Sequence, residues 1–284
     1  MLTKINNLID LALDEDAAFG DVTSQSVFPT DHTSEAQIVA RQDMVICGLE
    51  IAKRVFLRLD PGLKVDLEVK EGEAVTSGTI VMRIKGSTIS LLTAERTALN
   101  FMQRLTGIAT LSRRYADAAA KAGTGVRIVD TRKTTPGWRA LEKYAVRCGG
   151  CFNHRSSLGE HVLIKENHIA AAGSLAKAVG LARDNAPHCA KIEVETETLN
   201  DVIEALQAGA EVIMLDNMTP PQIQQAVEMI KQSAIIEISG GISLETIADY
   251  ALPGVDVISV GALTHSAPAA DFSMIIPVSR PEQT

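Results

Sequence analysis

The chain has 284 residues, with 27 lysines and arginines against 35 aspartates and glutamates, so its formal net charge is −8. A hydrophobic content of 46% with 22% charged residues is enough to build a core, which excludes a globally disordered chain. We find no run of about 18 apolar residues that could span a membrane, and the acidic balance argues against a protein that coats nucleic acid.

The cysteine content and the start of the chain both bear on the compartment. Four cysteines are too few for a disulfide framework, so we expect a reduced, cytoplasmic protein. Asp10 and Asp14 come too early for the apolar region of a signal peptide, which leads to the same expectation.

The first third of the chain predicts a small α/β domain. Residues 3–18 place apolar side chains at helical spacing, and residues 34–89 contain short strand-like runs that glycines separate. One helix is expected near residues 49–59, and residues 71–86 are interpreted as a structural hairpin.

A long helix is predicted to begin near Ser90. Ala98, Met102 and Leu105 fall on one apolar face, and Arg96 falls nearly opposite that face at about 100° per residue. Arg96 should therefore point away from the core that this helix covers. A solvated surface arginine is the simplest interpretation of that spacing alone.

The remaining sequence alternates between strand-like and helical stretches, in units of about 20 to 25 residues. Such β-α repeats without a glycine-rich dinucleotide turn favour an α/β barrel over an open dinucleotide-binding sheet. The expected strands cover residues 127–130, 161–165, 191–195, 211–216, 235–239 and 255–260, and the clearest helices cover 174–185, 198–208 and 220–232.

Polar residues or glycines follow almost every one of these strands. In α/β barrels the functional residues gather at the carboxyl ends of the strands. The residues at these ends are Asp130, Thr131, Arg132, Lys133, Lys165, Glu166, Asn167, Glu195, Asp216, Asn217, Ser239, Gly240, Gly241, Val260 and Gly261. We interpret them as one convergent site.

A basic region is embedded in this acidic chain. Residues 127–165 contain eight lysines and arginines but three aspartates and glutamates, a local charge of +5. Concentrated positive charge of this kind indicates a small anionic substrate, because arginine and lysine bind carboxylates and phosphates. A solvated basic face is the alternative, and the placement of Arg132, Lys133 and Lys165 at strand ends weakens it.

Two further features of the strand ends suggest phosphate chemistry. Glycines follow the last two strands, where barrels often bind phosphate on backbone N–H groups, although tight βα turns also need glycine. Glu195 and Asp216 end successive strands, which suggests Mg²⁺ or ribose hydroxyls as ligands. A structural ion pair would explain such carboxylates equally well.

One spacing suggests a metal site that we do not expect. Cys148 and Cys151 are separated by two glycines and followed by His154 and His161, which superficially matches a zinc motif. No second cysteine pair accompanies them, so we expect no zinc there.

The chain closely resembles the quinolinate phosphoribosyltransferase family, also called nicotinate-nucleotide pyrophosphorylase (carboxylating), over nearly its whole length. The most specific stretch is TRKTTPG (131–137), with the more distant His154-Arg155 pair. Further resembling stretches are EDAAFGDVTS (15–24), ERTALNFMQRLTGIAT (95–110), HVLIKENHI (161–169), IEVET (192–196), MLDNM (214–218), EISGGI (237–242) and DVISVGALTHSAPAADFSM (256–274).

This resemblance implies a reaction and an architecture. The family joins quinolinate to phosphoribosyl pyrophosphate (PRPP) with Mg²⁺, and it forms nicotinate mononucleotide, pyrophosphate and CO₂ in de novo NAD synthesis. It implies an open-faced α/β sandwich domain over residues 1–110, an incomplete parallel α/β barrel over 111–269, and a segment over 270–284 that returns to the first domain. It also implies a head-to-tail homodimer, with a hexamer as a possible further assembly.

The same resemblance implies roles for individual residues. Thr131, Arg132, His154 and Arg155 would bind quinolinate, and Lys133 and Lys165 would add positive charge between the two substrates. Glu195 and Asp216 would hold the ribose hydroxyls and Mg²⁺, directly or through substrate and water. Ser239, Gly240, Gly241, Val260, Gly261 and Ala262 would bind the 5′-phosphate, and Arg96 would reach the site of the other subunit. Lys133, Lys165, Glu195 and Asp216 are the expected catalytic residues.

Two other functions are compatible with parts of this pattern. A related group of enzymes found with molybdate-transport genes shares the TRKTTPG stretch, but residues 154–168 resemble the quinolinate enzymes better. A non-catalytic sensor of a phosphorylated sugar or a carboxylate is the second alternative, and the full set of cations and carboxylates argues against it.

Overall fold

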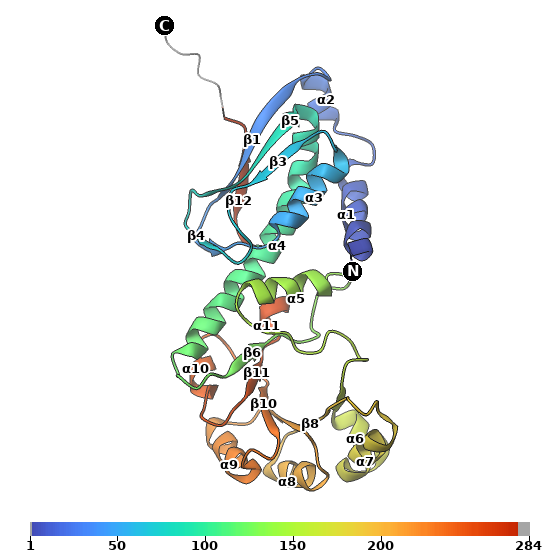
Figure 1. Cartoon of the computed structure of the whole chain (residues 1–284), viewed down its shortest axis with the longest axis vertical. Helices are drawn as coiled ribbons and strands as arrows, with labels where there is room; N and C mark the ends of the chain where they lie inside the picture. Colours follow the sequence, from blue (N-terminus) through green and yellow to red (C-terminus); the bar gives the residue numbers. More distant parts are fainter. Residues whose placement is uncertain (1, 278–284) are drawn as a thin grey trace. The chain divides into compact units, whose positions relative to one another are not determined.

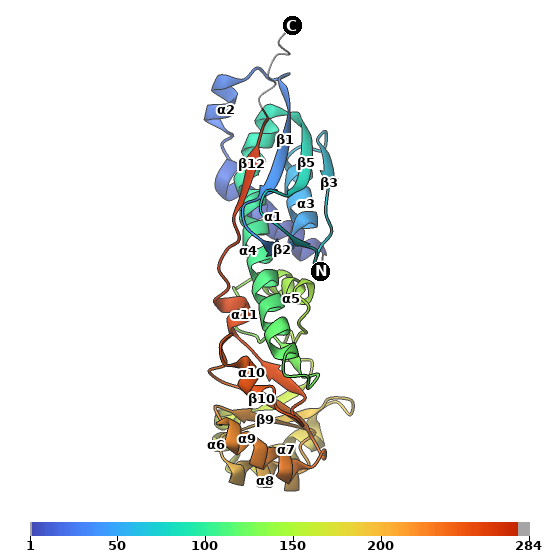
Figure 2. The same ribbon diagram turned by 90° about the vertical axis from the view of Figure 1, so that its left-hand side faces the viewer.

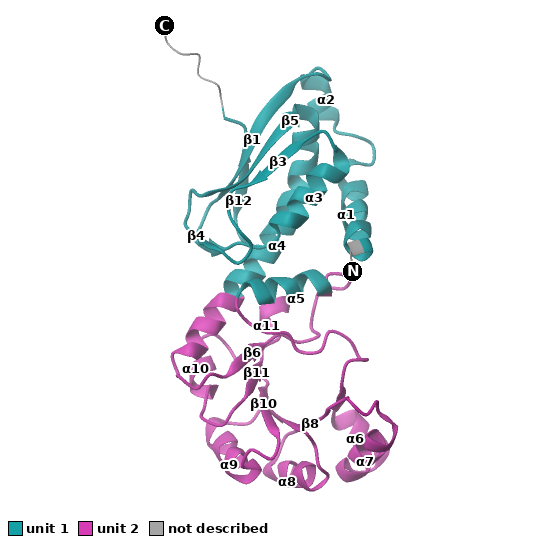
Figure 3. Cartoon of the chain, viewed as in Figure 1, with its two compact units in different colours: residues 1–111, 140–149, 267–284 teal, residues 112–139, 150–266 magenta. Residues whose placement is uncertain are grey.

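The computed structural model describes residues 2–277 and divides the chain into two units (Figure 3). Within that range the first unit comprises residues 2–111, 140–149 and 267–277, and the second comprises 112–139 and 150–266. The segment 140–149, which we expected in the barrel, thus belongs to the first unit. Residues 278–284 of the expected C-terminal segment lie outside the described residues.

The first unit contains an antiparallel sheet with the strand order β12-β1-β5-β3. Helix α3 and the beginning of α4 lie along one face of this sheet (Figures 1 and 2). The elements of this unit are α1 (Leu2–Ala17), α2 (Val22–Val27), β1 (Thr33–Ala40), β2 (Met44–Val45), α3 (Leu49–Leu59), β3 (Lys64–Leu67), β4 (Ala74–Val75), β5 (Ile80–Ser87), α4 (Thr88–Ala120), most of α5 (Arg139–Cys148) and β12 (Phe272–Ile275). Helix α4 continues past residue 111 into the second unit.

The core of the first unit follows from the apolar patterns of its elements. Val55 and Phe56 of α3 and Ile38 and Ile84 of the sheet are all fully buried. Burying such side chains contributes roughly 1.5 to 3 kcal/mol each relative to leaving them in water. The helix predicted near residues 49–59 is confirmed, with the same bounds.

Helix α4 has the two faces that its spacing predicts. Ala98, Met102, Leu105 and Ala109 are completely buried, whereas Arg96 is exposed. The prediction that Arg96 points away from the apolar face is therefore confirmed.

The hairpin expected over residues 71–86 is wrong. Its first strand, β4, pairs with β2 in a separate two-stranded sheet, and its second strand, β5, pairs with β1 and β3. The run GTIVMRI predicted β5, but the turn pattern that suggested a hairpin does not determine which partner each strand takes.

The second unit contains a six-stranded parallel sheet in the order β6-β11-β10-β9-β8-β7. Strands β6 and β7 stand at its two ends and do not pair with each other in the described part of the chain, so the expected incomplete barrel is confirmed. Helices α7, α8 and α9 cover the outer side of the sheet (Figure 1). The elements are β6 (Arg127–Val129), β7 (Val162–Ile164), α6 (Glu166–Ala172), α7 (Leu175–Asn185), β8 (Ile192–Thr196), α8 (Leu199–Gln207), β9 (Val212–Asp216), α9 (Pro220–Ile230), β10 (Ile235–Ser239), α10 (Ile247–Tyr250), β11 (Val257–Ser259) and α11 (Ala262–His265).

The predicted strands of the second unit are present within one or two residues of their expected ends. Helix α9 ends at Ile230 rather than at residue 232, because Lys231 and Gln232 adopt positive φ angles of 48° and 65°. None of the described helices is both long enough and apolar enough to cross a bilayer.

Candidate active site

A cavity of about 410 Å³ lies within the second unit, a size typical of sites for small molecules. Residues from the carboxyl ends of the parallel strands and from the loops that follow them line it. The lining residues are Thr131, Arg132, Lys133, His154, Arg155, Leu163, Lys165, Glu195, Met214, Asp216, Glu237, Ser239 and Ser259. The structure thus brings together most of the side chains that we selected from the sequence.

The other selected residues of this unit follow the lining residues in the chain. Gly240 and Gly241 come directly after Ser239, and Val260, Gly261 and Ala262 come directly after Ser259. Gly261 lies close to Lys133, since a Cβ atom at residue 261 would be 3.2 Å from Cδ of that lysine. Arg96 belongs to α4 in the first unit and is not among the lining residues.

Hydrogen bonds fix the backbone of the segment that follows β6. The buried carboxylate of Asp130 accepts the backbone N–H of His154 at 2.9 Å. Thr131 Oγ1 accepts the N–H of Lys133 at 3.0 Å, and the hydroxyl of Thr264 donates to the carbonyl of Lys133 at 2.8 Å. These contacts fix the backbone of Lys133, while its side chain stays exposed at the cavity.

Two arginines present positive charge to the cavity from partly buried positions. Arg155 is 9% exposed, and its guanidinium donates to the carbonyl of His161 at 3.1 Å. Burial, reinforced by the nearby charge of Arg132, lowers the pKa of Arg155. The Nε atom of Arg132 is buried and has no hydrogen-bond partner among the described residues. A bound anion would relieve both the charge repulsion and the missing hydrogen bond.

His154 lies against two buried carboxylates. Its Nε2 atom is 3.5 Å from Glu193 and 3.4 Å from Glu237, and Glu193 also contacts His161 Nε2 at 2.9 Å. Burial alone would lower the pKa of His154, but its contacts with the two carboxylates outweigh burial and raise the pKa to about 9. Burial alone would raise the pKa of Glu193, and the two histidines lower it to about 2.

A contact on the other side of the same ring opposes this charge. The backbone N–H of Arg155 points at Nδ1 of His154 at 2.8 Å, and only an unprotonated Nδ1 can accept it. The carboxylates dominate, because two buried negative charges without a cation between them would be far more costly than one lost hydrogen bond. His154 therefore acts as a cation of the cavity at neutral pH.

The acidic side of the cavity comes from the next two strands. Glu195 on β8 is partly buried and forms an ion pair with the exposed amino group of Lys165. Asp216 ends the neighbouring strand β9, and its carboxylate accepts the side-chain N–H of Asn217 at 2.7 Å. Both carboxylates therefore present oxygen atoms next to the cationic residues.

The turn after β10 requires glycine. Gly240 has a φ angle of 94°, and a Cβ atom there would lie 2.2 Å from Oδ1 of Asn217. Gly241 also has a positive φ angle, 61°, but a Cβ atom at that position would meet nothing within 4 Å. The first glycine is thus fixed by close approach and the second by backbone conformation alone.

Sequence reasoning missed Glu193 and Glu237. Both lie inside strands, in the runs IEVET and IIEIS, where apolar neighbours surround them. A carboxylate in the middle of an otherwise apolar parallel strand is itself a signal, because such a group needs a buried partner. Three residues of the zinc-like spacing fall into two different clusters, Cys148 with Cys47 and Glu71, and His154 and His161 with Glu193, and Cys151 belongs to neither.

Comparison with protein families matches almost the whole chain. The model of the quinolinate phosphoribosyl transferase N-terminal domain matches residues 21–106, and that of the C-terminal domain matches residues 108–275.

Individual relatives extend this match. A probable nicotinate-nucleotide pyrophosphorylase [carboxylating] of Synechocystis is 46% identical, over 93% of this chain and 90% of the relative. Quinolinate phosphoribosyltransferase [decarboxylating] 1b of Nicotiana tabacum is 40% identical, over 96% of this chain and 82% of the relative. The crystal structure of NadC from Streptococcus pyogenes superposes with a TM-score of 0.93 at 41% identity, over 97% of this chain and 96% of that one.

Proposed function

The chain belongs to the quinolinate phosphoribosyltransferase family, and on that premise we propose that the cavity of the second unit is the site of the family's reaction. The enzyme transfers the phosphoribosyl group of PRPP to quinolinate with loss of CO₂, and it forms nicotinate mononucleotide and pyrophosphate in de novo NAD biosynthesis. One observation supports the placement above all: cations from the segments that follow β6 and β7 line one cavity together with the carboxylates that β8 and β9 carry near their ends.

The cationic side suits quinolinate, a dicarboxylate. Arg132, with its unsatisfied Nε atom, and the largely buried pair His154 and Arg155 would bind the two carboxylates. Thr131 offers a hydroxyl beside them. Lys133 extends from a rigid backbone and would bind either the second carboxylate or the approaching pyrophosphate.

The opposite side suits PRPP. Glu195 and Asp216 would accept hydrogen bonds from the ribose hydroxyls. The loops after β10 and β11 would hold the 5′-phosphate, with the Ser239 hydroxyl and the backbone N–H groups of Gly240, Gly241, Gly261 and Ala262 as donors and Val260 as support. The tight turn at Gly240 keeps that first loop close to Asn217.

The carboxylates also fit the Mg²⁺ that accompanies PRPP. Mg²⁺ is usually held by one or two carboxylates together with substrate phosphates and water, and Glu195 and Asp216 offer two such groups on adjacent strands. When bound, the ion would neutralise negative charge on the pyrophosphate group. Lys165, which pairs with Glu195, would be released toward that charge as the substrate enters.

The residues of the chain explain how the reaction would be promoted. Arg132, His154 and Arg155, which would bind the two carboxylates, would orient quinolinate so that its ring nitrogen faces the anomeric carbon of PRPP. As the bond to pyrophosphate breaks, Lys133 and Lys165 would stabilise the departing charge. The positive charge of the ring nitrogen then stabilises the electron pair that loss of CO₂ leaves on the adjacent ring carbon, and protonation of this ylide completes the product.

The assembly that we propose is a homodimer in which Arg96 reaches the partner's cavity. Arg96 is exposed on α4 and does not line the cavity of its own chain, which supports a role across an interface. We further propose a cytoplasmic location, since four cysteines in 284 residues are too few for a disulfide framework.

Incubation of the protein with quinolinate, PRPP and Mg²⁺ tests the proposal. We expect nicotinate mononucleotide and CO₂ in equal amounts, no reaction without the metal ion and no need for ATP. Nicotinate lacks the 2-carboxylate, so it would leave cations of the site unpaired and should react about 10⁴-fold more slowly. Phthalate has both carboxylates but no ring nitrogen and should inhibit without reacting. Efficient turnover of nicotinate, or dependence on ATP, would contradict the assignment.

A further inference from the structure

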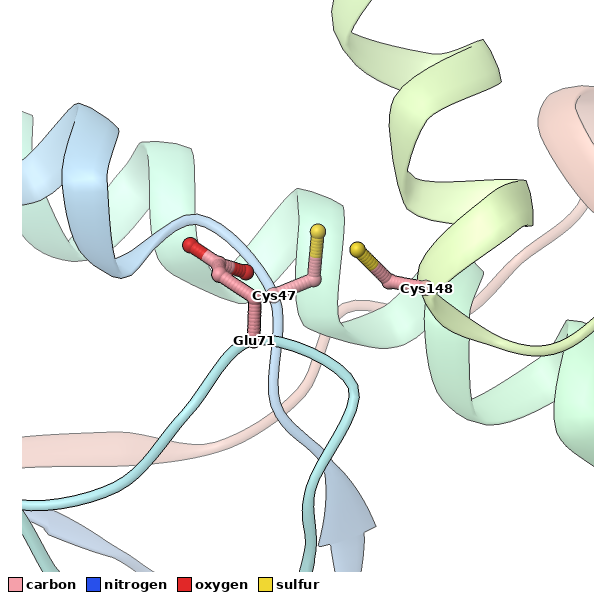
Figure 4. Close-up of side chains that lie close together, drawn as sticks. All are labelled: Cys47, Glu71 and Cys148. Carbon is pink, nitrogen blue, oxygen red and sulfur yellow. The ribbon is translucent and has the colours of Figure 1, made fainter.

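Two cysteines that are far apart in sequence lie together in the first unit. Cys47 precedes α3, Cys148 is the last residue of α5, and Glu71 lies in the loop between β3 and β4. The two sulfur atoms and the carboxylate of Glu71 are all within 4.8 Å of one another. Figure 4 shows the two thiols directed toward each other, with Glu71 on the Cys47 side. None of the three residues lines the cavity of the second unit.

The backbone holds this pair in place. Cys47 exchanges two hydrogen bonds with the buried Thr106: its N–H donates to the threonine hydroxyl at 3.0 Å, and that hydroxyl donates to its carbonyl at 2.8 Å. The loop at Gly72 packs so closely on the end of α5 that a Cβ atom there would lie 3.2 Å from the carbonyl oxygen of Cys148. The proximity of the thiols is therefore built into the fold of this unit.

The two thiols differ in exposure and in hydrogen bonding. Cys148 is partly exposed, whereas Cys47 is completely buried. Hydrogen bonds to the Cys148 sulfur from Cys47 and Tyr144 lower the pKa of Cys148 against the effect of burial. The hydrogen bond to Cys148, burial and the charge of Glu71 together raise the pKa of Cys47 well above its ordinary value. Solvent thus reaches the more acidic thiol, and the less acidic one stands behind it.

We propose that Cys148 and Cys47 are an oxidation site, in which Cys148 reacts with a peroxide and Cys47 then closes a disulfide with it. In the first step the Cys148 thiolate attacks one oxygen of hydrogen peroxide, the O–O bond breaks, and the departing hydroxide takes up a proton to become water. In the second step the Cys47 sulfur attacks the Cys148 sulfenic acid, the S–O bond breaks, and a second water leaves. Two thiols lose two electrons, one peroxide gains them, and a dithiol reductant reverses the change.

Glu71 is placed to assist the second step. Its carboxylate is a second hydrogen-bond acceptor beside the Cys47 thiol, whose single proton can turn to it from the Cys148 sulfur. Burial raises the pKa of Glu71 despite the backbone N–H groups of Gly48 and Glu50 that its oxygens accept. The carboxylate can therefore take the proton of Cys47 as that sulfur attacks, and pass it to the leaving hydroxide.

The other two cysteines of the chain are matched controls. Cys189 is more exposed than Cys148. Among the described residues it belongs to no cluster of cysteine, histidine and acidic side chains. Cys151 is buried, its thiol donates to the carbonyl of Ser112, and burial raises its pKa to about 12. If exposure alone controlled oxidation, Cys189 would react first, whereas the proposed chemistry selects Cys148.

The test treats the full-length protein with one equivalent of hydrogen peroxide and identifies oxidised cysteines by mass spectrometry of the digest. We expect a Cys47–Cys148 disulfide that dithiothreitol removes, with Cys151 still reduced. In Cys47→Ser, dimedone should capture a sulfenic acid on Cys148. In Cys148→Ser, Cys47 should stay reduced. Glu71→Gln, which keeps an oxygen for the backbone N–H groups, should slow disulfide closure by about tenfold or more without slowing the first step.

Three results would overturn the proposal. The first is oxidation of Cys189 before Cys148. The second is a sulfenic acid on Cys148 that persists in the parent protein, because Cys47 would then not be its partner. The third is one equivalent of zinc in the purified protein that is lost in both Cys47→Ser and Cys148→Ser, since the cluster would then be a metal site. Because Cys47 is buried, thermal unfolding of each variant is compared with that of the parent before its oxidation is interpreted.

Discussion

Arg155 is buried and charged, and it forms no ion pair with a carboxylate among the described residues. Its contribution to substrate binding should therefore be large. In Arg155→Ala we expect kcat/KM for quinolinate to fall by about 10- to 150-fold, the loss of roughly 1.5 to 3 kcal/mol from a charge-assisted contact. Steady-state kinetics with varied quinolinate measures this change, and thermal unfolding shows whether the variant is folded.

Arg183 provides the matched control for that substitution. It forms an exposed ion pair with Glu211, away from the lining residues of the cavity. Arg183→Ala should leave kcat/KM within about twofold of the parent value, because exposed ion pairs contribute little. Equal kinetic losses in both arginine variants would refute the role of Arg155.

Glu193 should set the pH range in which His154 is charged. The pKa of His154 is raised to about 9, so its charge, and the stability it contributes with Glu193, are fully present below about pH 6.5 and are lost as the pH rises through about 9. In Glu193→Gln one of the two carboxylates is neutral. We therefore expect the alkaline fall in kcat/KM for quinolinate to move to lower pH by about one unit or more.

The pH profile of kcat/KM between pH 6 and pH 10 distinguishes this effect from general damage. A merely destabilised variant would lose activity equally across the range. An unchanged alkaline limb in Glu193→Gln would show that His154 does not supply the charge. At acid pH the sign is reversed: the low pKa of Glu193, about 2, means that its contribution to stability is present above about pH 4.5 and is lost only as the pH falls toward 2.

The success of sequence reasoning at this scale depended on where each residue lies in its strand. Lys165, Asp216 and Ser239 stand at or just after strand ends, and parallel strands deliver their carboxyl ends to one edge whatever the exact register. Glu193 and Glu237 lie within strands, so their direction depends on the pleat, which the sequence does not state. The approach of Cys47 to Cys148 depends on the packing of α5 in the first unit, and no local pattern encodes such a long-range contact.

At the scale of elements, the turn between β10 and the following segment has the strictest requirement for glycine in the site. We expect Gly240→Ala to raise the KM for PRPP by about tenfold or more, because the new Cβ atom would displace Asn217 and with it the phosphate-binding backbone. Gly241→Ala has only the cost of a left-handed conformation, about 1 to 2 kcal/mol, and no collision.

The comparison of the two variants at varied PRPP is the measurement. The KM for PRPP should rise much more in Gly240→Ala than in Gly241→Ala, while the KM for quinolinate changes less in both. Parallel losses would indicate that backbone conformation, and not contact with Asn217, controls the loop.

The helices and strands also show which elements the sequence pattern can predict and which it cannot. Helix α3 was predicted with the same bounds, because its apolar residues repeat every three to four positions and Gly48 marks its start. The short helices α6, α10 and α11 were not predicted, since four to seven residues carry too few repeats to show a period. The hairpin predicted over residues 71–86 was wrong, because the two residues of β4 contain no information about their partner, which is β2.

At the scale of the whole molecule, the proposed dimer predicts complementation between two inactive variants. Arg96→Ala and Lys133→Ala should each abolish most of the activity. In a mixed dimer one site receives both substitutions and the other receives neither. If subunits exchange at random, about half of the dimers are mixed, so about a quarter of all sites should regain activity.

The experiment mixes the two purified variants, confirms exchange with differently tagged subunits, and measures product formation. A mixture of Lys133→Ala with Arg155→Ala is the control, because both residues belong to the same cavity and each site of the mixed dimer carries one lesion. No recovery in the Arg96 mixture despite verified exchange would assign Arg96 to its own chain.

The pairing of β12 with β1 has a consequence for the order in which the chain folds. Residues 272–275 occupy the edge of a sheet whose other strands end by residue 87, and the complete second unit is synthesised between them. During translation, β1 therefore leaves the ribosome long before β12 is made, and its edge stays unpaired during that time. Strands from other chains can add to such an unpaired edge. The second unit is continuous in sequence apart from residues 140–149. It can therefore complete its fold before the first unit has all of its strands. The unit whose synthesis begins first is thus the last to be finished, and a chain truncated before β12 would keep an unpaired edge for its whole lifetime.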